Sequence, residues 1–400
     1  MVMKAVHKIP PPPWMVAPES VAVMDILNEE SANALPQALF VGGCVRNTLM
    51  NRIVDDIDIA TPLLPQEVMT RFEKRGFKVI PTGIDHGTVT AIINKKTFEI
   101  TTLRRDLKTD GRHATVIFTD GWKEDAARRD FTMNTLLANR DGHIFDPTGR
   151  GLEDLKAGHV MFVGDPAQRI AEDYLRILRF FRFHAFYGTG TPDPQALEAC
   201  KSAAQYIGSL SRERVTQEFF KIMRADNAAD VLKIMFKNNI LNKIPDVNYK
   251  PLILARLVEA QKKYGMYDLV ARLVVLTRDC ERLEQYLIFS NKQKKDFRLI
   301  IKALDSMSGL SDKDIKRLVY HYGAETIKQT LLYYSALHNV TVDIGLVQNW
   351  QPPVFPVKGD DIMAAGIPAG PMIGAALARL EQWWIENDMK PDKAACLRQL

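Results

Sequence analysis

The chain changes its secondary-structure pattern at about residue 165, and this change constrains its fold more than any other feature. Between residues 38 and 148, short β-rich runs such as ALFVGG, GTVTAII and TFEITTL alternate with helical stretches, one of them at 65–75. After residue 165, apolar residues recur at helical spacing, as in RERVTQEFFKIMRA. The pattern predicts an α+β chain in which a sheet domain is followed by an all-α arm. A doubly wound fold, in which strands and helices alternate throughout, does not fit.

Two adjacent glycines follow the first strong β-rich run. Gly42 and Gly43 come directly after LFV and before a predicted short helix that contains Arg46. Without Cβ atoms, such a pair lets backbone N–H groups approach a phosphate at a helix N-terminus. Arg46 could add a bidentate phosphate contact. Paired glycines are also common in ordinary turns, so the prediction of a phosphate site depends on the carboxylates that follow.

Those carboxylates are Asp56 and Asp58, two residues apart in a strand-like run. On a strand, both side chains point to the same side. Two like charges that close are unfavourable unless a cation joins them, and Mg²⁺ prefers oxygen ligands shared with nucleotide phosphates. Glu99, in another β-rich run, could join the pair from a neighbouring strand. We therefore predict Asp56 and Asp58 as Mg²⁺ ligands and Asp56, Asp58 and Glu99 as catalytic residues. A solvated strand edge and a structural glutamate are the alternatives.

The basic residues are unevenly distributed along the chain. Residues 201–300 contain 19 Lys and Arg against 11 Asp and Glu, whereas residues 1–150 contain 19 of each. A local basic excess is typical of a protein that binds a polyanionic partner, or of solvated helix faces.

Four widely spaced cysteines without a CxxC pair argue against a disulfide framework or a zinc site. Because no secretory signal or long apolar run is present, we expect a cytoplasmic protein without a membrane partner. The oligomeric state is not determined by the sequence.

GGxVR followed by DIDIAT resembles the nucleotidyltransferase signature of class II tRNA CCA-adding enzymes and bacterial poly(A) polymerases. Four further segments match this family in its order: DAARRDFTMNTL, FDPTGRGLEDL, EDYLRILRFFRF and LSRERVTQEFFKIM. The resemblance implies a polymerase-β-like nucleotidyltransferase palm followed by an extended all-α neck, body and tail. The parts expected are an N-terminal extension and helix (1–35), the head or palm (36–160), a nucleotide-selecting neck (161–245), an RNA-binding body (246–340) and a tail (341–400).

The resemblance also implies which residues bind the nucleotide. They are Gly42, Gly43, Arg46, Arg128, Arg129, Asn134, Asp173, Arg176, Arg179 and Arg182. Asp173 and Arg176 match the positions that read the incoming base. Because the last four residues recur every three positions, a helix would keep them on one side. A surface helix with salt bridges is the alternative.

The activity implied is Mg²⁺-dependent addition of CCA, from CTP and ATP, to the 3′ end of tRNA with release of pyrophosphate. CC-only, A-only and poly(A) addition are alternatives, as is a non-catalytic RNA-binding protein. The segment Arg104–Phe118 resembles the complete loop of CCA-adding members, and PLLPQEV after DIDIAT lacks the basic residues of poly(A) polymerases. Asn47 stands where the family usually has aspartate. We expect this difference to affect the stability of the helix that contains Asn47 more than catalysis.

Overall fold

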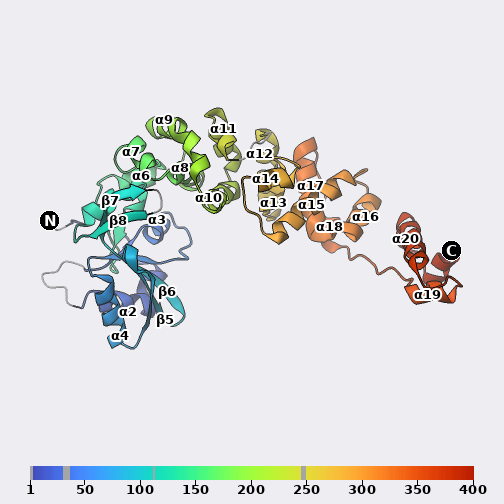
Figure 1. The fold of residues 1–400 in the computed structure, drawn as a ribbon, viewed down its shortest axis with the longest axis horizontal. Helices are drawn as coiled ribbons and strands as arrows, with labels where there is room; N and C mark the ends of the chain where they lie inside the picture. The colour runs from blue at the N-terminus through green and yellow to red at the C-terminus, as the bar shows by residue number, and fades with distance from the viewer. Residues whose placement is uncertain (1–2, 30–36, 111–112, 245–248) are drawn as a thin grey trace. The chain divides into compact units, whose positions relative to one another are not determined.

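The computed structural model describes residues 3–29, 37–110, 113–244 and 249–400, which form two compact units. Unit 1 consists of Met1–Ala225 and Ile234–Ile244, and unit 2 of Asp226–Lys233 and Pro245–Leu400. The predicted class is confirmed, because a mixed sheet near the N-terminus is followed by helices (Figure 1). The five-part division of the chain stays a prediction. Within the described ranges, no helix is long and apolar enough to cross a membrane. The cytoplasmic location also stays a prediction.

Unit 1 contains an eight-stranded sheet with the order β1-β10-β9-β2-β3-β6-β5-β4. Its strands are β1 (His7–Lys8), β2 (Leu39–Val41), β3 (Asp58–Thr61), β4 (Lys78–Gly83), β5 (Thr88–Ile93), β6 (Lys96–Thr102), β9 (Leu137–Ala138) and β10 (His143–Phe145). β3 and β6 are parallel, and their register places Asp58 opposite Glu99. The expectation that Glu99 lies on a strand next to Asp58 is therefore met. A separate hairpin of β7 (Arg104–Asp110) and β8 (His113–Phe118) forms the segment that resembles the family's loop.

Short helices surround this sheet. They are α1 (Pro13–Val16), α2 (Pro18–Leu27), α3 (Gly43–Leu49), α4 (Pro65–Lys74), α5 (Trp122–Ala127) and α6 (Gly151–Ala157), with 3₁₀ turns η2 (Ile84–His86) and η3 (Thr132–Asn134). α4 begins at a proline, whose fixed φ suits the first helical position. α4 contacts β4 and β5 (Figure 1), and its Val68 and Phe72 are buried.

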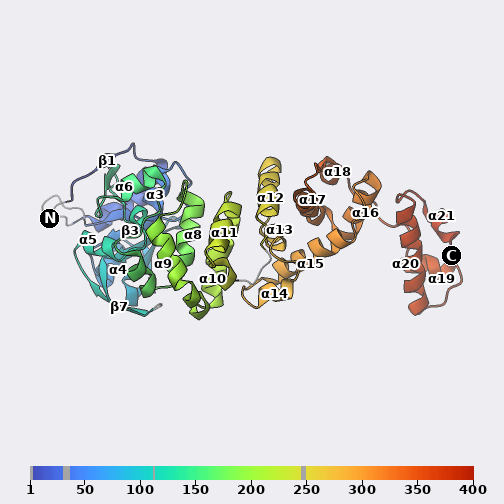
Figure 2. The same ribbon diagram turned by 90° about the horizontal axis from the view of Figure 1, so that it is seen from above.

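A helical layer completes unit 1. Its helices are α7 (Pro166–Glu172), α8 (Leu175–Tyr187), α9 (Pro194–Ala203) and α10 (Arg212–Arg224), with the 3₁₀ turns η4 (Ala204–Ser209) and η5 (Leu241–Lys243). α8 packs against α10, as Figure 2 shows in green. The buried Phe131 ring lies 4.8 Å from Phe162 and 4.8 Å from Phe183 of α8. This aromatic cluster joins α8 to the segment that follows α5, so the two predicted nucleotide-binding segments share one core.

The described residues of unit 2 form helices and no strand. These helices are α12 (Pro251–Tyr264), α13 (Leu269–Val274), α14 (Cys280–Glu284), α15 (Asn291–Asp305), α16 (Asp312–Tyr322), α17 (Ala324–His338), α18 (Gly345–Asn349), α19 (Gly359–Ala364), α20 (Pro371–Glu386) and α21 (Lys393–Leu397); α11 (Ala228–Lys237) is divided between the units. The last three pack around Leu380 and Trp384, and Tyr320 of α16 contacts Trp384. The four cysteines are free and buried.

Candidate active site

A pocket of about 470 Å³ in unit 1 is lined by all ten residues that the sequence assigns to the nucleotide. Its lining consists of Gly42, Gly43, Arg46, Asp58, Arg128, Arg129, Asp130, Asn134, Asp173, Leu175, Arg176, Arg179, Arg182, Phe183 and Arg214. A pocket of about 830 Å³ between the proline-rich segment and the end of α3 contains none of these residues. The smaller pocket therefore joins β3, α3, the segment after α5 and α8 in one cationic site.

The two aspartates of the DID segment do not share a strand, so that expectation is wrong. β3 begins at Asp58, and the exposed Asp56 lies in the loop before it. The antiparallel neighbour β2 ends at Val41, where Gly42 with a φ of 71° turns the backbone into α3. No β2 residue is thus available opposite Asp56. Asp58 lines the pocket, whereas Asp56 and Glu99 are not among its lining residues.

Asp58 lies in an electrostatic environment that disfavours its charge. Burial and the charges of Glu99 and Asp56 outweigh the opposing effect of Arg129 and Arg46, and together these groups raise the pKa of Asp58 from its ordinary value to about 6. The described residues contain no group of three His, Cys, Asp or Glu side chains placed to hold one metal ion. A hard cation would compensate these clustered carboxylates, and their oxygens are ligands that Mg²⁺ prefers. The donor set thus fits Mg²⁺ on Asp56 and Asp58, with further oxygens supplied by substrate.

Arg46 reaches the pocket from α3 but is held by three neighbours. It is 8 % exposed, and its Nη1 donates to Asn134 Oδ1. Nη2 donates to the Tyr187 hydroxyl at 2.8 Å, and Nε and Nη2 donate to Asn47 Oδ1. A guanidinium has five N–H groups, so these four contacts leave one for a phosphate oxygen. The bidentate phosphate contact expected from the sequence would therefore need an exchange of partners.

Arg128 and Arg129 are oriented by the buried Asp125, which sequence reasoning did not identify. Arg128 Nη2 lies 2.6 Å from Asp125 Oδ1, and Arg129 Nη2 lies 3.0 Å from Oδ2. Burial alone would raise the pKa of Asp125, but the two guanidinium groups hold it below its ordinary value. One ionised carboxylate therefore fixes both arginines beside the glycines. A Cβ on Gly42 would lie 3.5 Å from Arg129 Nη1, which is an ordinary contact distance, so it is the φ of 71° that favours glycine at this position.

Arg179 and Arg182 line the pocket but already form ion pairs with carboxylates. Arg179 Nε lies 2.7 Å from Asp130 Oδ2, and Arg182 Nε lies 3.0 Å from Glu218 Oε2. Asp130 Oδ1 also accepts from Asn134 Nδ2 at 2.9 Å. Sequence reasoning missed Asp130 and Glu218, although Asp130 directly follows the two arginines of the RRDFT segment. We interpret these arginines as organising the pocket as well as adding positive charge.

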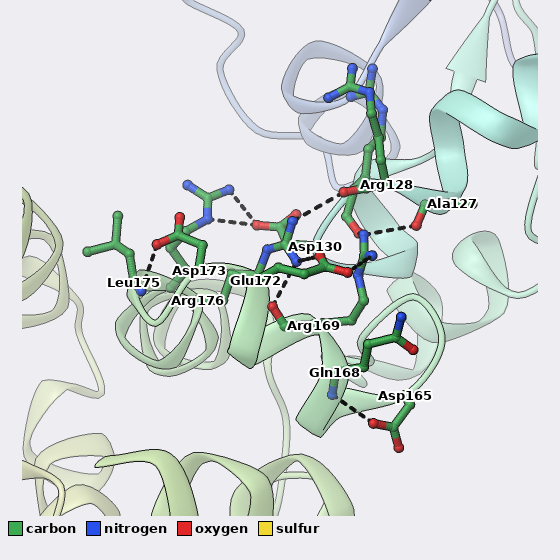
Figure 3. A network of polar contacts seen from close by, with 12 residues as sticks. Ala127, Arg128, Asp130, Asp165, Gln168, Arg169, Glu172, Asp173, Leu175 and Arg176 are labelled. Atoms are coloured by element: carbon green, nitrogen blue, oxygen red, sulfur yellow. Dashed lines mark hydrogen bonds and ion pairs between the residues drawn. The ribbon is translucent and has the colours of Figure 1, made fainter. Parts of the chain in front are cut away.

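Asp173 and Arg176, the two residues expected to read the base, are not placed on one helix (Figure 3). Asp173 has extended backbone between α7 and α8, with φ −156° and ψ 107°, and its Oδ1 accepts from Leu175 N at the start of α8. Asp173 Oδ2 accepts from Arg214 Nη2 at 2.7 Å. The prediction that Asp173 and Arg176 lie on one helix is therefore wrong, because Asp173 ends α7 and α8 begins two residues later at Leu175.

Arg176 is held by its own set of partners (Figure 3). Its Nη1 donates to Glu172 Oε2 and, at 2.8 Å, to the Arg169 carbonyl. Its Nη2 donates to the Arg128 carbonyl at 3.3 Å. Arg176 and Asp173 are thus paired with other residues and not with each other. Glu172 and Arg214, which sequence reasoning did not select, complete this wall of the pocket.

Comparisons with known proteins agree on the kind of molecule. The family model described as "Poly A polymerase head domain" matches residues 38–161, and "Probable RNA and SrmB- binding site of polymerase A" matches 191–250. The chain is 36 % identical over 378 residues to human "CCA tRNA nucleotidyltransferase 1, mitochondrial", covering 88 % of this chain and 83 % of that protein. It is 35 % identical to the "CCA-adding enzyme" of Anoxybacillus flavithermus, over 72 % of this chain and 71 % of that protein.

A solved structure supports the same relationship. The chain resembles the Bacillus stearothermophilus CCA-adding enzyme in complex with CTP, with a TM-score of 0.76 and 26 % sequence identity. The match covers 95 % of each chain.

Proposed function

This chain belongs to the family of CCA-adding tRNA nucleotidyltransferases, and we propose that it adds CCA to the 3′ end of tRNA from CTP and ATP. The single observation that supports this activity best is the shared pocket, in which Asp58 and the pair Asp173 and Arg176 line one space. A chemical centre and a base-reading wall that line one pocket are what nucleotide addition without a template requires. The resemblance of Arg104–Phe118 to the complete loop of CCA-adding members supports CCA over CC addition.

In the proposed reaction, the 3′-hydroxyl oxygen of tRNA attacks the α-phosphorus of the nucleotide in line. The new P–O bond forms as the bond to the β-phosphate oxygen breaks, so pyrophosphate leaves and the hydroxyl proton is released. Asp56 and Asp58 would hold Mg²⁺, with Glu99 next to Asp58 on the parallel strand. Bound there, Mg²⁺ would supply charge neutralisation of the triphosphate and activation of the attacking hydroxyl.

The remaining pocket residues position the triphosphate. Gly42 and Gly43 bring backbone close to the phosphates, while Arg128 and Arg129, held by Asp125, offer fixed positive charge. Because phosphoryl transfer depends mainly on positioning and charge stabilisation, side chains that are already oriented lower the barrier without reorganising.

Asp173 and Arg176 would select the base by complementary hydrogen bonding. A carboxylate accepts from an exocyclic amine, and a guanidinium donates to ring-nitrogen or carbonyl acceptors. Cytosine and adenine both present an amine next to a ring-nitrogen acceptor, whereas uracil does not. To meet a base, Asp173 would leave Arg214, and Arg176 would leave Glu172. The ion pairs with Arg214 and Glu172 thus hold both side chains in place, and a base would replace these partners.

The RNA partner would contact the helical part of the chain. Residues 201–300 have eight more basic than acidic residues, 19 against 11. A-form RNA is recognised mostly by shape and by contacts to phosphate and 2′-hydroxyl groups, and such binding weakens as salt concentration rises. We propose that these helices bind the acceptor stem of tRNA.

The variants Asp173→Ala and Arg176→Ala are expected to relax base selection. Each removes one of two hydrogen-bonding groups, so CTP and ATP incorporation should fall about tenfold or more, and the preference over UTP should shrink. The measurement is kcat/KM for each nucleotide on tRNA lacking CCA and on tRNA ending in CC. The matched control is Glu198→Ala, an exposed carboxylate of α9 paired with Lys201. An unchanged preference over UTP in both pocket variants would contradict the assignment.

A further inference from the structure

Tyr187, the last residue of α8, lies between two arginines of the segment that includes α3. Its ring centroid is 4.3 Å from Arg46 Cζ and 4.7 Å from Arg52 Cζ. Its hydroxyl accepts from Arg46 Nη2 at 2.8 Å and donates to Asn47 Oδ1 at 3.0 Å. Arg52 Nη2 also donates to the Phe186 carbonyl at 2.5 Å. One aromatic side chain thus makes both cation–π and hydrogen-bond contacts with the phosphate side of the pocket.

These contacts close a ring of polar interactions beside the pocket, and every member of the ring except Tyr187 lines the pocket. Starting from α8, Arg179 pairs with Asp130, Asp130 accepts from Asn134, and Asn134 accepts from Arg46. Arg46 then donates to Tyr187, which lies on α8 again. The ring connects two points on α8, eight residues apart in sequence, through α3 and η3. Such closure restrains the position of α8 relative to α3 more than a single contact would.

We propose that Tyr187 is a positioning residue that fixes the Arg46 guanidinium and sets the separation between the phosphate and base ends of the nucleotide site. This inference rests on the proposed function. Arg46 lines the pocket on α3, while Arg176 lines it from the first turn of α8. A nucleotide must reach both ends at once, so a shift of α8 along α3 would weaken binding of CTP and ATP alike.

Asn47 takes part in the same arrangement. Its Oδ1 accepts from Arg46 and from Tyr187, and its Nδ2 donates to the Ile53 carbonyl at 3.1 Å. An aspartate here would place a negative charge next to Arg46 and compete with phosphate for it. The neutral amide holds the guanidinium and leaves its charge available for the nucleotide. Tyr187 and Asn47 therefore act as one unit on Arg46.

The test uses Tyr187→Phe, Tyr187→Leu, Asn47→Ala and the double variant Tyr187→Phe with Asn47→Ala, all in the full chain. KM and kcat for CTP and ATP are measured by tRNA extension, and Kd for CTP alone by calorimetry. Loss of the hydroxyl should raise KM and Kd about 2- to 10-fold with kcat changed less than about twofold. Tyr187→Leu, which also loses the contacts of the aromatic ring, should raise KM and Kd more than Tyr187→Phe does. The double variant should show less than the product of the single effects, because both residues act on Arg46.

A control and three other outcomes decide the result. Tyr322→Phe removes a hydroxyl bonded to Ser306 in unit 2 and should leave KM unchanged. A merely structural role for Tyr187 would lower the melting temperature and the active fraction, and so kcat, while KM and Kd stay at their wild-type values; that result would overturn the proposal. Independent, multiplicative effects of Tyr187 and Asn47 would also overturn it. If wild-type protein extends no tRNA, the proposed function fails, while the CTP Kd values still decide the role of Tyr187.

Discussion

Asp58→Asn is expected to lower kcat for nucleotide addition by at least about 10²–10³-fold, the range seen when one preorganised charge-stabilising group is removed. The change keeps the shape of the side chain but removes the anionic oxygens that would hold Mg²⁺ beside the reacting phosphate. It also removes a charge that burial, Glu99 and Asp56 disfavour, so the fold should be unharmed or slightly more stable. The measurement is single-turnover extension of tRNA with saturating CTP, beside a thermal melt.

Asp55→Asn provides the matched control, because Asp55 is an exposed carboxylate three residues earlier that does not line the pocket. Its rate should stay within about threefold of wild type, as expected for a surface charge. Equal rates for the Asp58 variant and wild type would show that the DID segment does not perform the chemistry.

Asp130→Ala is expected to destabilise unit 1 by about 3–5 kcal/mol, because it leaves the guanidinium of Arg179 without its partner in a largely buried site. Asp130 is 8 % exposed, and besides Arg179 it accepts from Asn134 and from the Phe131 amide. Hydrogen exchange of the peptides covering α8 and η3 measures this loss locally, which matters because two units need not unfold together.

Glu29→Ala is the control for that effect. Glu29 pairs with Arg75 on the surface of the same unit, and both side chains are about half exposed. Removing the Glu29 carboxylate should change the free energy of local opening, measured by hydrogen exchange, by about 0–1 kcal/mol. Equal protection of α8 in the Asp130 variant and in wild type would show that this ion pair does not hold α8 in place.

Local sequence patterns predicted much of the fold and of the pocket. The helical stretch predicted at 65–75 is found as α4, and the alternating β-formers around Glu99 predicted the strand that places it opposite Asp58. The motifs that match the family predicted one nucleotide site for residues that lie on α3, η3 and α8, and these residues line one pocket. These features depend on short stretches of chain, whose periodicity and turn residues can be read directly.

Other features depend on tertiary contacts and were not predicted. The i+3 spacing of Asp173 and Arg176 suggested one helix, but Asp173 lies between α7 and α8, where it accepts from Leu175 N and pairs with Arg214, 41 residues later. Glu218 and Tyr187 have no local motif that indicates their partners. Carboxylates and aromatic rings on helices usually face solvent or core, so only the tertiary structure places Glu218 against Arg182 and Tyr187 against Arg46.

The most direct test of CCA addition is to sequence the 3′ ends that the protein makes on tRNA that lacks CCA. Purified protein, Mg²⁺, CTP and ATP would be incubated with this tRNA, and the products sequenced beside reactions with one nucleotide and with the Asp58→Asn variant. CCA addition predicts CCA and no further nucleotide, CC with CTP alone, and extension by the Asp58→Asn variant that is slower by at least about 10²-fold. Ends that stop at CC with both nucleotides present, a long A tail, or unchanged tRNA would contradict it.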